Sequence, residues 1–240
     1  MAVQDRYPEY LSDQRRVFDE LITEDWNTYV SAEWDAVRRF EVAQLFARVK
    51  PADVLDVGCG CGFHDREMAG YSFVHAVDAI DYSEKSVERA NRVYPHGKVA
   101  RWVADLASDQ PRKAYDLVVS FQVFEHLDDP DTYFRFCRAA CAKDGYIAIL
   151  TPNRRRLRNV LRRLRGLGPE LLDPQHFKEY SVSDLRLLGE SHGFKYVCWF
   201  GYGLNGLSWI DRRPVEARLR MGQLLPWIAN CFCLIMKKLS

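Results

Sequence analysis

The feature of the sequence that most constrains the fold is the stretch VLDVGCGCG at positions 54–62. The apolar residues around Asp56 predict a short buried strand over 54–57. Glycine then recurs at every second position from Gly58 to Gly62, which predicts a sharp turn from the strand into a helix. Glycine suits such a turn because it lets the backbone bend tightly and lets a ligand approach closely. A dinucleotide, a nucleotide or a nucleoside would fit there, and a strand-to-helix connection without a ligand is the structural alternative.

The spacing of the glycines narrows the kind of ligand. The pattern Asp-x-Gly-x-Gly-x-Gly differs from the dinucleotide fingerprint Gly-x-Gly-x-x-Gly, whose third glycine comes one residue later. No Lys-Ser or Lys-Thr pair follows, so it is not a Walker-type phosphate loop. The stretch resembles the first motif of class I S-adenosylmethionine (SAM)-dependent methyltransferases, and the resemblance covers roughly residues 50–200. It implies SAM as cofactor, S-adenosylhomocysteine (SAH) as product, and a cofactor turn formed by Asp56, Gly58, Cys59, Gly60 and Gly62.

Strand and helix patterns alternate along the chain, which predicts a doubly wound α/β fold with a mostly parallel sheet. The resemblance implies a Rossmann-like sheet of seven strands, with the last strand antiparallel between the fifth and sixth. The strands are expected over 54–57, 73–80, 99–103, 115–120, 146–150, 195–200 and 229–236. The expected plan is one domain over 1–240: a helical cap or lid (1–50), a SAM-binding core (51–200), a basic substrate-side insertion (151–180), and a C-terminal hairpin and last strand (201–240).

Composition excludes some classes of protein. The 240-residue chain is 48% hydrophobic and carries a net charge of +1, which argues against bulk attraction to nucleic acid or membrane and leaves room for local charge. No apolar run reaches the ~18 residues of a membrane span, and the first residues lack a signal-peptide layout. Seven cysteines, an odd number, predict reduced thiols in a cytoplasmic protein, most of them packed in the core.

Acidic residues follow the second and third predicted strands, where open α/β sheets bind ligands. The resemblance implies that an acid at the end of the second strand binds both ribose hydroxyls. We assign this role to Asp81, next to Tyr82, with Asp78 as the alternative, because the helix pattern fits from Asp81. After the third strand, Asp105 is implied to bind the adenine amino group and Leu106 a ring nitrogen. After the fourth strand, the residues implied to border the methionine part are Phe121 and Gln122.

Two histidines fall where the resemblance places the acceptor. His126 and His176 are candidate general bases for an O-methylation, because imidazole accepts a proton near neutral pH, and structural hydrogen bonding is the alternative for each. Glu125, His126 and His176 also resemble the metal site of small-RNA 2′-O-methyltransferases. Gln122 replaces the first acid of that site, so the expectation is no metal, with these three residues as the alternative ligands.

Arginine is concentrated in one predicted helix. Seven of the twelve residues from Arg154 to Arg165 are arginines, and leucines and a valine share one face. Such a helix fits an anionic small-molecule acceptor, a phosphate backbone or an anionic membrane surface, and a solvated surface helix is the alternative. Nucleic acid is not favoured, given the net charge.

Aromatic residues near the N-terminus, Trp26, Tyr29 and Trp34 with Tyr7 and Tyr10, either pack helices onto the domain or form a lid over the substrate. Residues 201–228 predict an ordered loop or hairpin, at a substrate pocket or a homodimer contact. The sequence thus predicts a methyltransferase that acts on a small-molecule hydroxyl in secondary-metabolite, sugar or quinone biosynthesis. The alternatives are a metal-assisted RNA 2′-O-methyltransferase and a SAM-binding regulatory partner.

Overall fold

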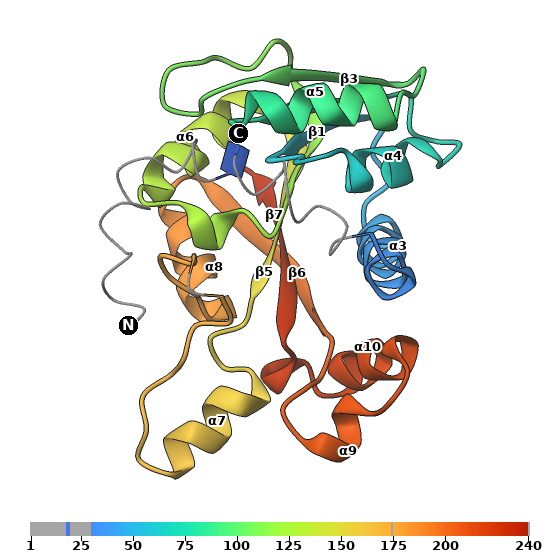
Figure 1. Ribbon diagram of the computed structural model, residues 1–240. Helices are drawn as coiled ribbons and strands as arrows, with labels where there is room; N and C mark the ends of the chain where they lie inside the picture. The colour runs from blue at the N-terminus through green and yellow to red at the C-terminus, as the bar shows by residue number, and fades with distance from the viewer. Residues whose placement is uncertain (1–17, 20–29, 174, 240) are drawn as a thin grey trace.

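The computed structural model describes residues 18–19, 30–173 and 175–239, and shows one sheet with helices on both faces (Figure 1). Its strands are β1 (Asp53–Val57), β2 (Ala76–Asp81), β3 (Val99–Val103), β4 (Tyr115–Phe121), β5 (Cys141–Pro152), β6 (Phe194–Tyr202) and β7 (Cys231–Lys238). Their order across the sheet is β3-β2-β1-β4-β5-β7-β6. Strands β1 to β5 pair in parallel, and β7 runs antiparallel to β5 and β6. The predicted Rossmann-like sheet, with its last strand between the fifth and sixth, is confirmed.

Each face of the sheet carries its own hydrophobic cluster. The helices are α3 (Ala32–Phe46), α4 (Phe63–Ala69) and α5 (Glu84–Val93) on one face, with α6 (Pro130–Ala140) and α8 (Val182–Ser191) on the other. Leu45 of α3 packs in one cluster with Val54, and Phe134 of α6 packs in the other with Leu55. Because consecutive strand residues point to opposite faces, a central strand covered on both sides is largely apolar, as the buried run 117–119 of β4 is.

The strand bounds differ in detail from those expected. β2 begins at Ala76 instead of residue 73, and β5 begins at Cys141 instead of residue 146. Asp144 lies within the longer β5 with a φ of 64°, a conformation that aspartate tolerates better than most side chains. The early start of β5 pairs Cys141 with Tyr115 across an irregularity in the ladder.

The prediction of a loop or hairpin over residues 201–228 is wrong. This segment forms α9 (Ser208–Asp211), α10 (Val215–Leu224) and the short 3-10 helix η4 (Pro226–Ile228). Three glycines suggested a loop, but they lie before α9, and Pro214 begins α10. Helix α10 packs on α3, where Arg218 pairs with Glu33 at 3.2 Å and Gln223 donates to Gln44 at 2.7 Å. The segment thus joins the N-terminal helix to the last strand.

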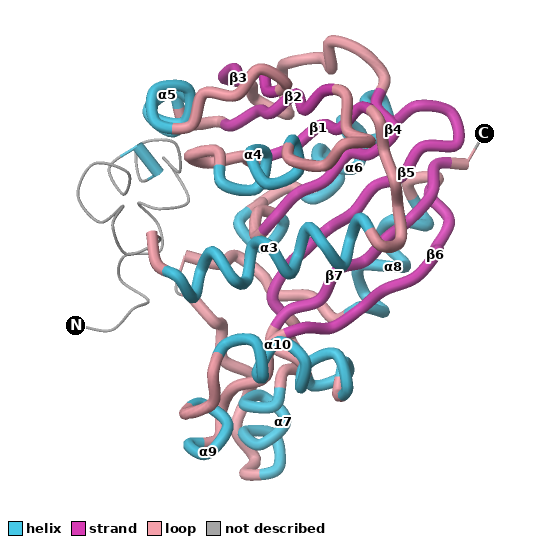
Figure 2. Tube along the Cα trace, turned by 90° about the vertical axis from the view of Figure 1, so that its right-hand side faces the viewer, coloured by secondary structure: helices cyan, strands magenta, loops and turns pink. Residues whose placement is uncertain are grey.

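The arginine-rich segment forms α7 (Leu157–Leu164), as predicted. Figures 1 and 2 both place α7, α9 and α10 together at one end of the molecule. The aromatic residues Tyr7, Tyr10, Trp26 and Tyr29 lie outside the described residues, and Trp34 of α3 is 42% exposed. Within the described ranges, no helix has both the length and the apolarity needed to cross a membrane.

Candidate functional site

The glycine turn lies between β1 and α4 and bends sharply, as the sequence predicted. Gly58 has a φ of 76° and Gly62 a φ of 81°, which residues with a Cβ rarely adopt. A Cβ on Gly58 would also lie 2.4 Å from Val123 Cγ2. The backbone N–H groups of Gly58 and Cys59 donate to the carbonyl of Ile80, at 2.7 and 2.9 Å, so the turn is bound directly to β2.

Asp81 lies at the carboxyl end of β2 and faces this turn. Its carboxylate accepts hydrogen bonds from the N–H of Gly60 at 2.7 Å and from that of Ser83 at 2.8 Å. Burial raises the pKa of Asp81, and these two backbone donors act in the opposite direction. Asp78, the alternative, lies deeper in β2 and accepts from the Tyr115 hydroxyl at 2.9 Å. The geometry therefore supports Asp81 as the acid at the ligand edge; the neighbouring Tyr82 is 42% exposed.

The loop after β3 lies beside Asp81, because the N–H of Ala104 donates to the Asp81 carbonyl at 3.0 Å. In this loop the Asp105 carboxylate accepts from the N–H of Ala107 at 2.9 Å, and the Asp105 N–H donates to Asp109 at 2.8 Å. Asp105 and Leu106 are both partly exposed. The residues expected to bind the ribose and the adenine therefore stand at neighbouring strand ends.

A group of buried charges under the turn was not predicted from the sequence. Arg101 on β3 donates to Asp65 on α4 through Nε at 2.6 Å and through a terminal nitrogen at 2.8 Å, and both side chains are at most 1% exposed. A Cβ on Gly62 would lie 3.0 Å from Arg101 Nε, so this pair supports the turn from below. An arginine inside an otherwise apolar strand is the one sequence signal that could have revealed the pair.

Asp56 lies on the same face of the sheet as Arg101, since Ala79 pairs with one on each side. Both carboxylate oxygens of Asp56 are buried and accept no hydrogen bond from any residue the structure describes. Burial, together with the charges of Asp65 and Asp81, raises its pKa well above the usual range. A buried acceptor without a donor attracts a cationic partner. The ammonium group of SAM is such a partner, so the buried oxygens of Asp56 fit the expected cofactor.

A second polar network joins the end of β4 to two helices, and the sequence did not reveal it. His64 Nε2 lies 2.8 Å from Glu41 Oε2, and the His64 ring stacks on Phe121 with 3.8 Å between ring centroids. Tyr202 hydrogen-bonds to Glu41 and accepts from the Gln122 amide at 3.1 Å. Both residues expected to border the methionine part of the cofactor, Phe121 and Gln122, thus contact a carboxylate–imidazole network.

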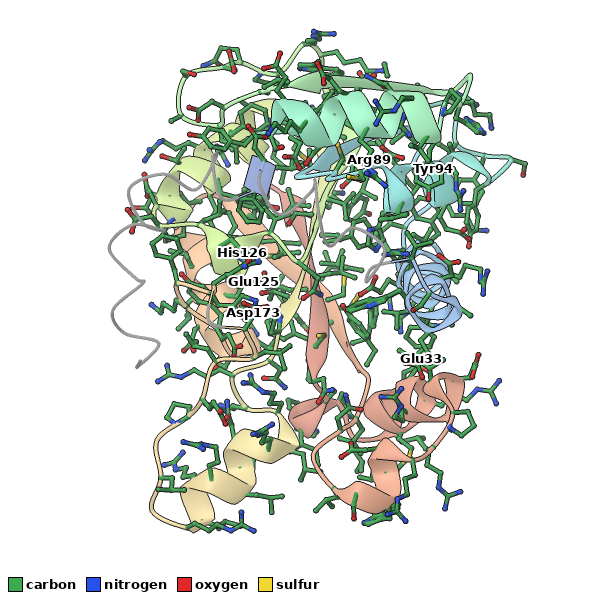
Figure 3. All side chains as sticks on the ribbon, viewed as in Figure 1. Glu33, Arg89, Tyr94, Glu125, His126 and Asp173 are labelled. Carbon is green, nitrogen blue, oxygen red and sulfur yellow. The ribbon has the colours of Figure 1, made fainter. Side chains whose placement is uncertain are left out.

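The two predicted catalytic histidines lie side by side. The rings of His126 and His176 meet edge to face with 4.8 Å between centroids. Figure 3 shows Glu125, His126 and Asp173 close together beside the sheet. Burial, followed by the nearby His176, lowers the pKa of His126 to about 4. His126 is therefore neutral at physiological pH and a weak base.

Glu125, His126 and His176 each offer one ligand atom, and these atoms lie within 4.8 Å of one another. Glu125 is 1% exposed; one oxygen accepts from Thr151 Oγ1 at 2.9 Å, and the other has no hydrogen-bond partner among described residues. Burial raises the pKa of Glu125 to about 7. The three donors could hold a divalent ion with small side-chain movements, since imidazole and carboxylate suit such ions.

His176 also belongs to a buried network that fastens the arginine-rich segment to the core. His176 Nδ1 lies 3.1 Å from Glu179 Oε1, and the other Glu179 oxygen accepts from Arg156. The N–H of Phe177 donates to the Glu125 carbonyl at 2.9 Å. Glu179 and Arg156 are at most 3% exposed, so this ion pair anchors both ends of the segment that carries α7.

A short piece of the N-terminal region spans the carboxyl edge of the sheet. Asp19 accepts a hydrogen bond of 2.5 Å from Ser83 Oγ, next to Asp81. Phe18 packs edge to face on His126, with 5.5 Å between ring centroids. Residues 18–19 thus contact both the end of β2 and the segment that follows β4.

Solved structures with this architecture define its class. A magnesium protoporphyrin IX methyltransferase from Synechocystis, solved with SAH bound, superposes with a TM-score of 0.65 over 95% of this chain and 99% of that chain, at 17% identity. The N-methyltransferase NodS from Bradyrhizobium japonicum, also with SAH, gives a TM-score of 0.61 at 13% identity, over 94% and 98% of the two chains. The fold is that of class I SAM-dependent methyltransferases.

Sequence comparison extends this from fold to family. The family model for a methyltransferase domain matches residues 27–198, and the chain belongs to this family of SAM-dependent methyltransferases. A probable SAM-dependent methyltransferase of Mycobacterium tuberculosis is 36% identical over 168 residues, which are 68% of this chain and 57% of that protein. A relative from Mycolicibacterium smegmatis is 30% identical over 79% of this chain and 73% of its own length. The cofactor of this family is SAM, and the chain spans little more than half the length of the Mycobacterium tuberculosis relative.

Proposed function

We propose that this enzyme transfers the methyl group of SAM to a hydroxyl group of a small-molecule acceptor. The pairing of His64 with Glu41, stacked on Phe121, carries this proposal. A hydroxyl must lose its proton as it attacks, and a carboxylate-held imidazole beside the reacting atoms is suited to receive that proton. Among similar proteins, a ubiquinone biosynthesis O-methyltransferase of Bordetella bronchiseptica is 38% identical over 109 residues, which are 42% of this chain and 43% of that protein.

The residues have distinct parts in this reaction. SAM supplies a methyl group on a positively charged sulfur, which an acceptor oxygen displaces in line. Asp56 would hold the ammonium group of the cofactor's methionine portion and Asp81 its ribose, and Gly58 to Gly62 would let it approach the backbone closely. Glu41 accepts a hydrogen bond from the Nε2–H of His64, which leaves the other ring nitrogen free to accept a proton. Residues 18–19 cover the edge and keep water away from the reacting oxygen.

The acceptor assignment is tested with radiolabelled SAM and a panel of hydroxylated aromatic compounds, sugars, amines and carboxylic acids. Methyl transfer is expected to hydroxyl compounds. The His64→Asn variant should then lose about 100-fold in kcat, in the range typical of a general base, while binding SAH normally. His75→Asn, at an exposed loop position, is the matched control and should retain full activity. Preference for an amine, or a His64→Asn variant as active as the control, would overturn the proposal.

The cluster of Glu125, His126 and His176 favours a second candidate, a metal-assisted RNA 2′-O-methyltransferase. Under our first proposal these residues form a metal-free network, and His126 and His176 are structural or assist the acceptor. The two candidates differ in what keeps Glu125 ionised: an ion would hold it as a carboxylate, whereas without an ion burial favours its protonated form.

Without a metal, replacing Glu125 by glutamine should stabilise the protein increasingly as pH rises. The pKa of Glu125 is about 7 in the folded protein, and 4.5 is the usual value expected for the unfolded chain. Folding therefore favours the protonated carboxyl, and the wild type loses stability as pH rises from 4.5 to 7. From pH 5 to 8, the free energy of unfolding of Glu125→Gln should gain about 2.5 kcal/mol on that of the wild type. The lowered pKa of His126 makes the free energy of unfolding rise with pH, but this contribution is common to the wild type and the variant. Urea unfolding in EDTA measures the difference.

The same comparison with added Mg²⁺ or Mn²⁺ separates the candidates. Stabilisation of the wild type by the ion, absent in Glu125→Gln and reversed by EDTA, together with methyl transfer to RNA, would establish the second candidate instead.

A further inference from the structure

Two insertions form one end of the molecule. The first, residues 154–173, leaves the carboxyl end of β5 and contains α7; the second, residues 203–228, follows the end of β6 and contains α9, α10 and η4. Figures 1 and 2 show both at the same end of the sheet, and we call them together the basic end. Because β5 runs parallel to β1, β2 and β4, the basic end adjoins the edge that carries the cofactor site.

The basic end has a large excess of positive charge. It contains eleven arginines, no lysine and four acidic residues, although the whole chain has a net charge of only +1. Glu170 neutralises part of this charge by pairing with Arg158 and Arg162, both at 3.3 Å. Seven arginines are exposed and form no ion pair with any residue in the described ranges: Arg154, Arg155, Arg163, Arg165, Arg212, Arg213 and Arg220. The remainder of the molecule must therefore be acidic, and the protein is strongly polarised.

The same end also exposes large apolar side chains. The three most exposed that the structure describes all lie here: Leu224 at 81%, Leu164 at 79% and Trp227 at 71%. Trp209, at 56%, lies on the second insertion as well. Leucine and tryptophan cost free energy in water and are normally covered in a monomer, so several of them on one end indicate a surface that meets a partner.

The combination of side chains identifies the chemistry of that partner. Exposed arginines are attracted to a surface of negative charge, and the exposed leucines gain from burial in an apolar layer beneath such a surface. Tryptophan favours the boundary between headgroups and acyl chains. A nucleic acid would satisfy the arginines and offer nothing to Leu164 or Leu224. The anionic headgroups and acyl chains of a phospholipid bilayer satisfy both.

We propose that the basic end docks this enzyme on the surface of a bilayer that contains anionic phospholipid. Arginines on both insertions would lie at the phosphate level, with the exposed leucines and tryptophans inserted just below. Docking in this way would also turn the cofactor edge toward the bilayer, so that an apolar hydroxyl acceptor dissolved there could reach the site; this last step rests on the proposed function. The docking itself does not depend on it.

The test is co-sedimentation of the full chain with vesicles of phosphatidylcholine alone or enriched in phosphatidylglycerol. Binding is expected only to the anionic vesicles and should weaken as salt is raised, because screening reduces attraction between charges. The double variants Arg163→Glu/Arg213→Glu and Leu164→Ser/Leu224→Ser should each weaken binding at least about tenfold, since each removes one of the two contributions.

Matched variants elsewhere on the surface serve as controls. Arg39→Glu/Arg92→Glu makes the same change in net charge at exposed positions on α3 and α5, and Leu187→Ser removes an apolar side chain that is 66% exposed on α8. Both should bind vesicles as the wild type does. Thermal stabilisation by SAH must be retained in every variant, which shows that the variants are folded and separates failure of docking from failure of the proposed reaction.

Three outcomes would overturn the proposal. One is absence of binding to anionic vesicles. Another is an equal loss of binding in the controls, which would show that net charge alone is responsible. The third is salt-sensitive binding of single-stranded RNA by the basic end, weakened by the arginine variant and unaffected by the leucine variant, with no vesicle binding; the surface would then be a nucleic-acid interface.

Discussion

Replacing Asp81 by alanine is expected to weaken SAH binding by about 100-fold or more, because hydrogen bonds to a charged group contribute roughly 1.5–3 kcal/mol each. The carboxylate stands at the end of β2, 2.7 Å from the N–H of Gly60, and ribose hydroxyls above the glycine turn would complete its set of donors. The variant loses the ribose partner and also the acceptor that orders Gly60. Isothermal titration with SAH measures the effect directly, and thermal unfolding with and without SAH confirms it.

Asp78→Ala provides the matched control. This residue is on the same strand, but its carboxylate binds the Tyr115 hydroxyl at 2.9 Å instead of the turn. The control should lose some stability and keep its affinity for SAH. The reverse result, with Asp78→Ala failing to bind SAH and Asp81→Ala binding it, would move the ribose site to Asp78 and contradict the assignment.

The second large effect is expected at Arg101. Replacing it by methionine should lower the free energy of unfolding by about 3–5 kcal/mol, the usual cost of breaking a buried ion pair by removing one partner. The loss leaves Asp65 as an unpaired buried carboxylate and removes the one nearby positive charge that favours ionised Asp56. Urea unfolding at neutral pH measures this change.

A double variant distinguishes the ion pair from simple packing. In Arg101→Met/Asp65→Leu no buried charge is left unpaired, and replacing a buried pair with apolar residues of similar size is often neutral or stabilising. Most of the lost stability should therefore return. SAH affinity should fall in both variants, because Arg101 lies 3.0 Å from where a Cβ on Gly62 would lie and supports the cofactor turn. A double variant no more stable than Arg101→Met would show that packing, not charge, is responsible.

Three buried networks suggest how the site is kept in shape. The pair of Arg101 and Asp65 supports the glycine turn, and Glu41 links α3 to His64 and Tyr202. The third network, with Glu179 between His176 and Arg156, fastens the first insertion beside the end of β4. Cofactor turn, acceptor side and basic end are thus each connected to the sheet by buried ion pairs or hydrogen bonds, which are sensitive to geometry and tolerate little displacement.

Much of the fold, and the edge of the sheet at which we expect the cofactor, could be predicted from the sequence, because the signals there are local. The apolar run at 54–57, the glycines that follow it and the helix pattern after Asp81 each depend on residues a few positions apart. Alternation of strand and helix then limits the sheet to few topologies, and parallel strands bring their carboxyl ends to one edge. Asp81 and Asp105 are therefore found at that edge, as predicted.

The remaining features depend on contacts between distant parts of the chain, and only the tertiary structure decided them. Glu41 and His64 come together because α3 and α4 cover the same face of the sheet, and Tyr202 reaches them from the far end of β6. Likewise, the sequence of each insertion of the basic end, taken alone, predicts an ordinary surface segment. Their charges and apolar side chains become one surface because β5 and β6 both end at the same side of the sheet. Local sequence sets the conformation of each element, but packing against the sheet sets which elements meet.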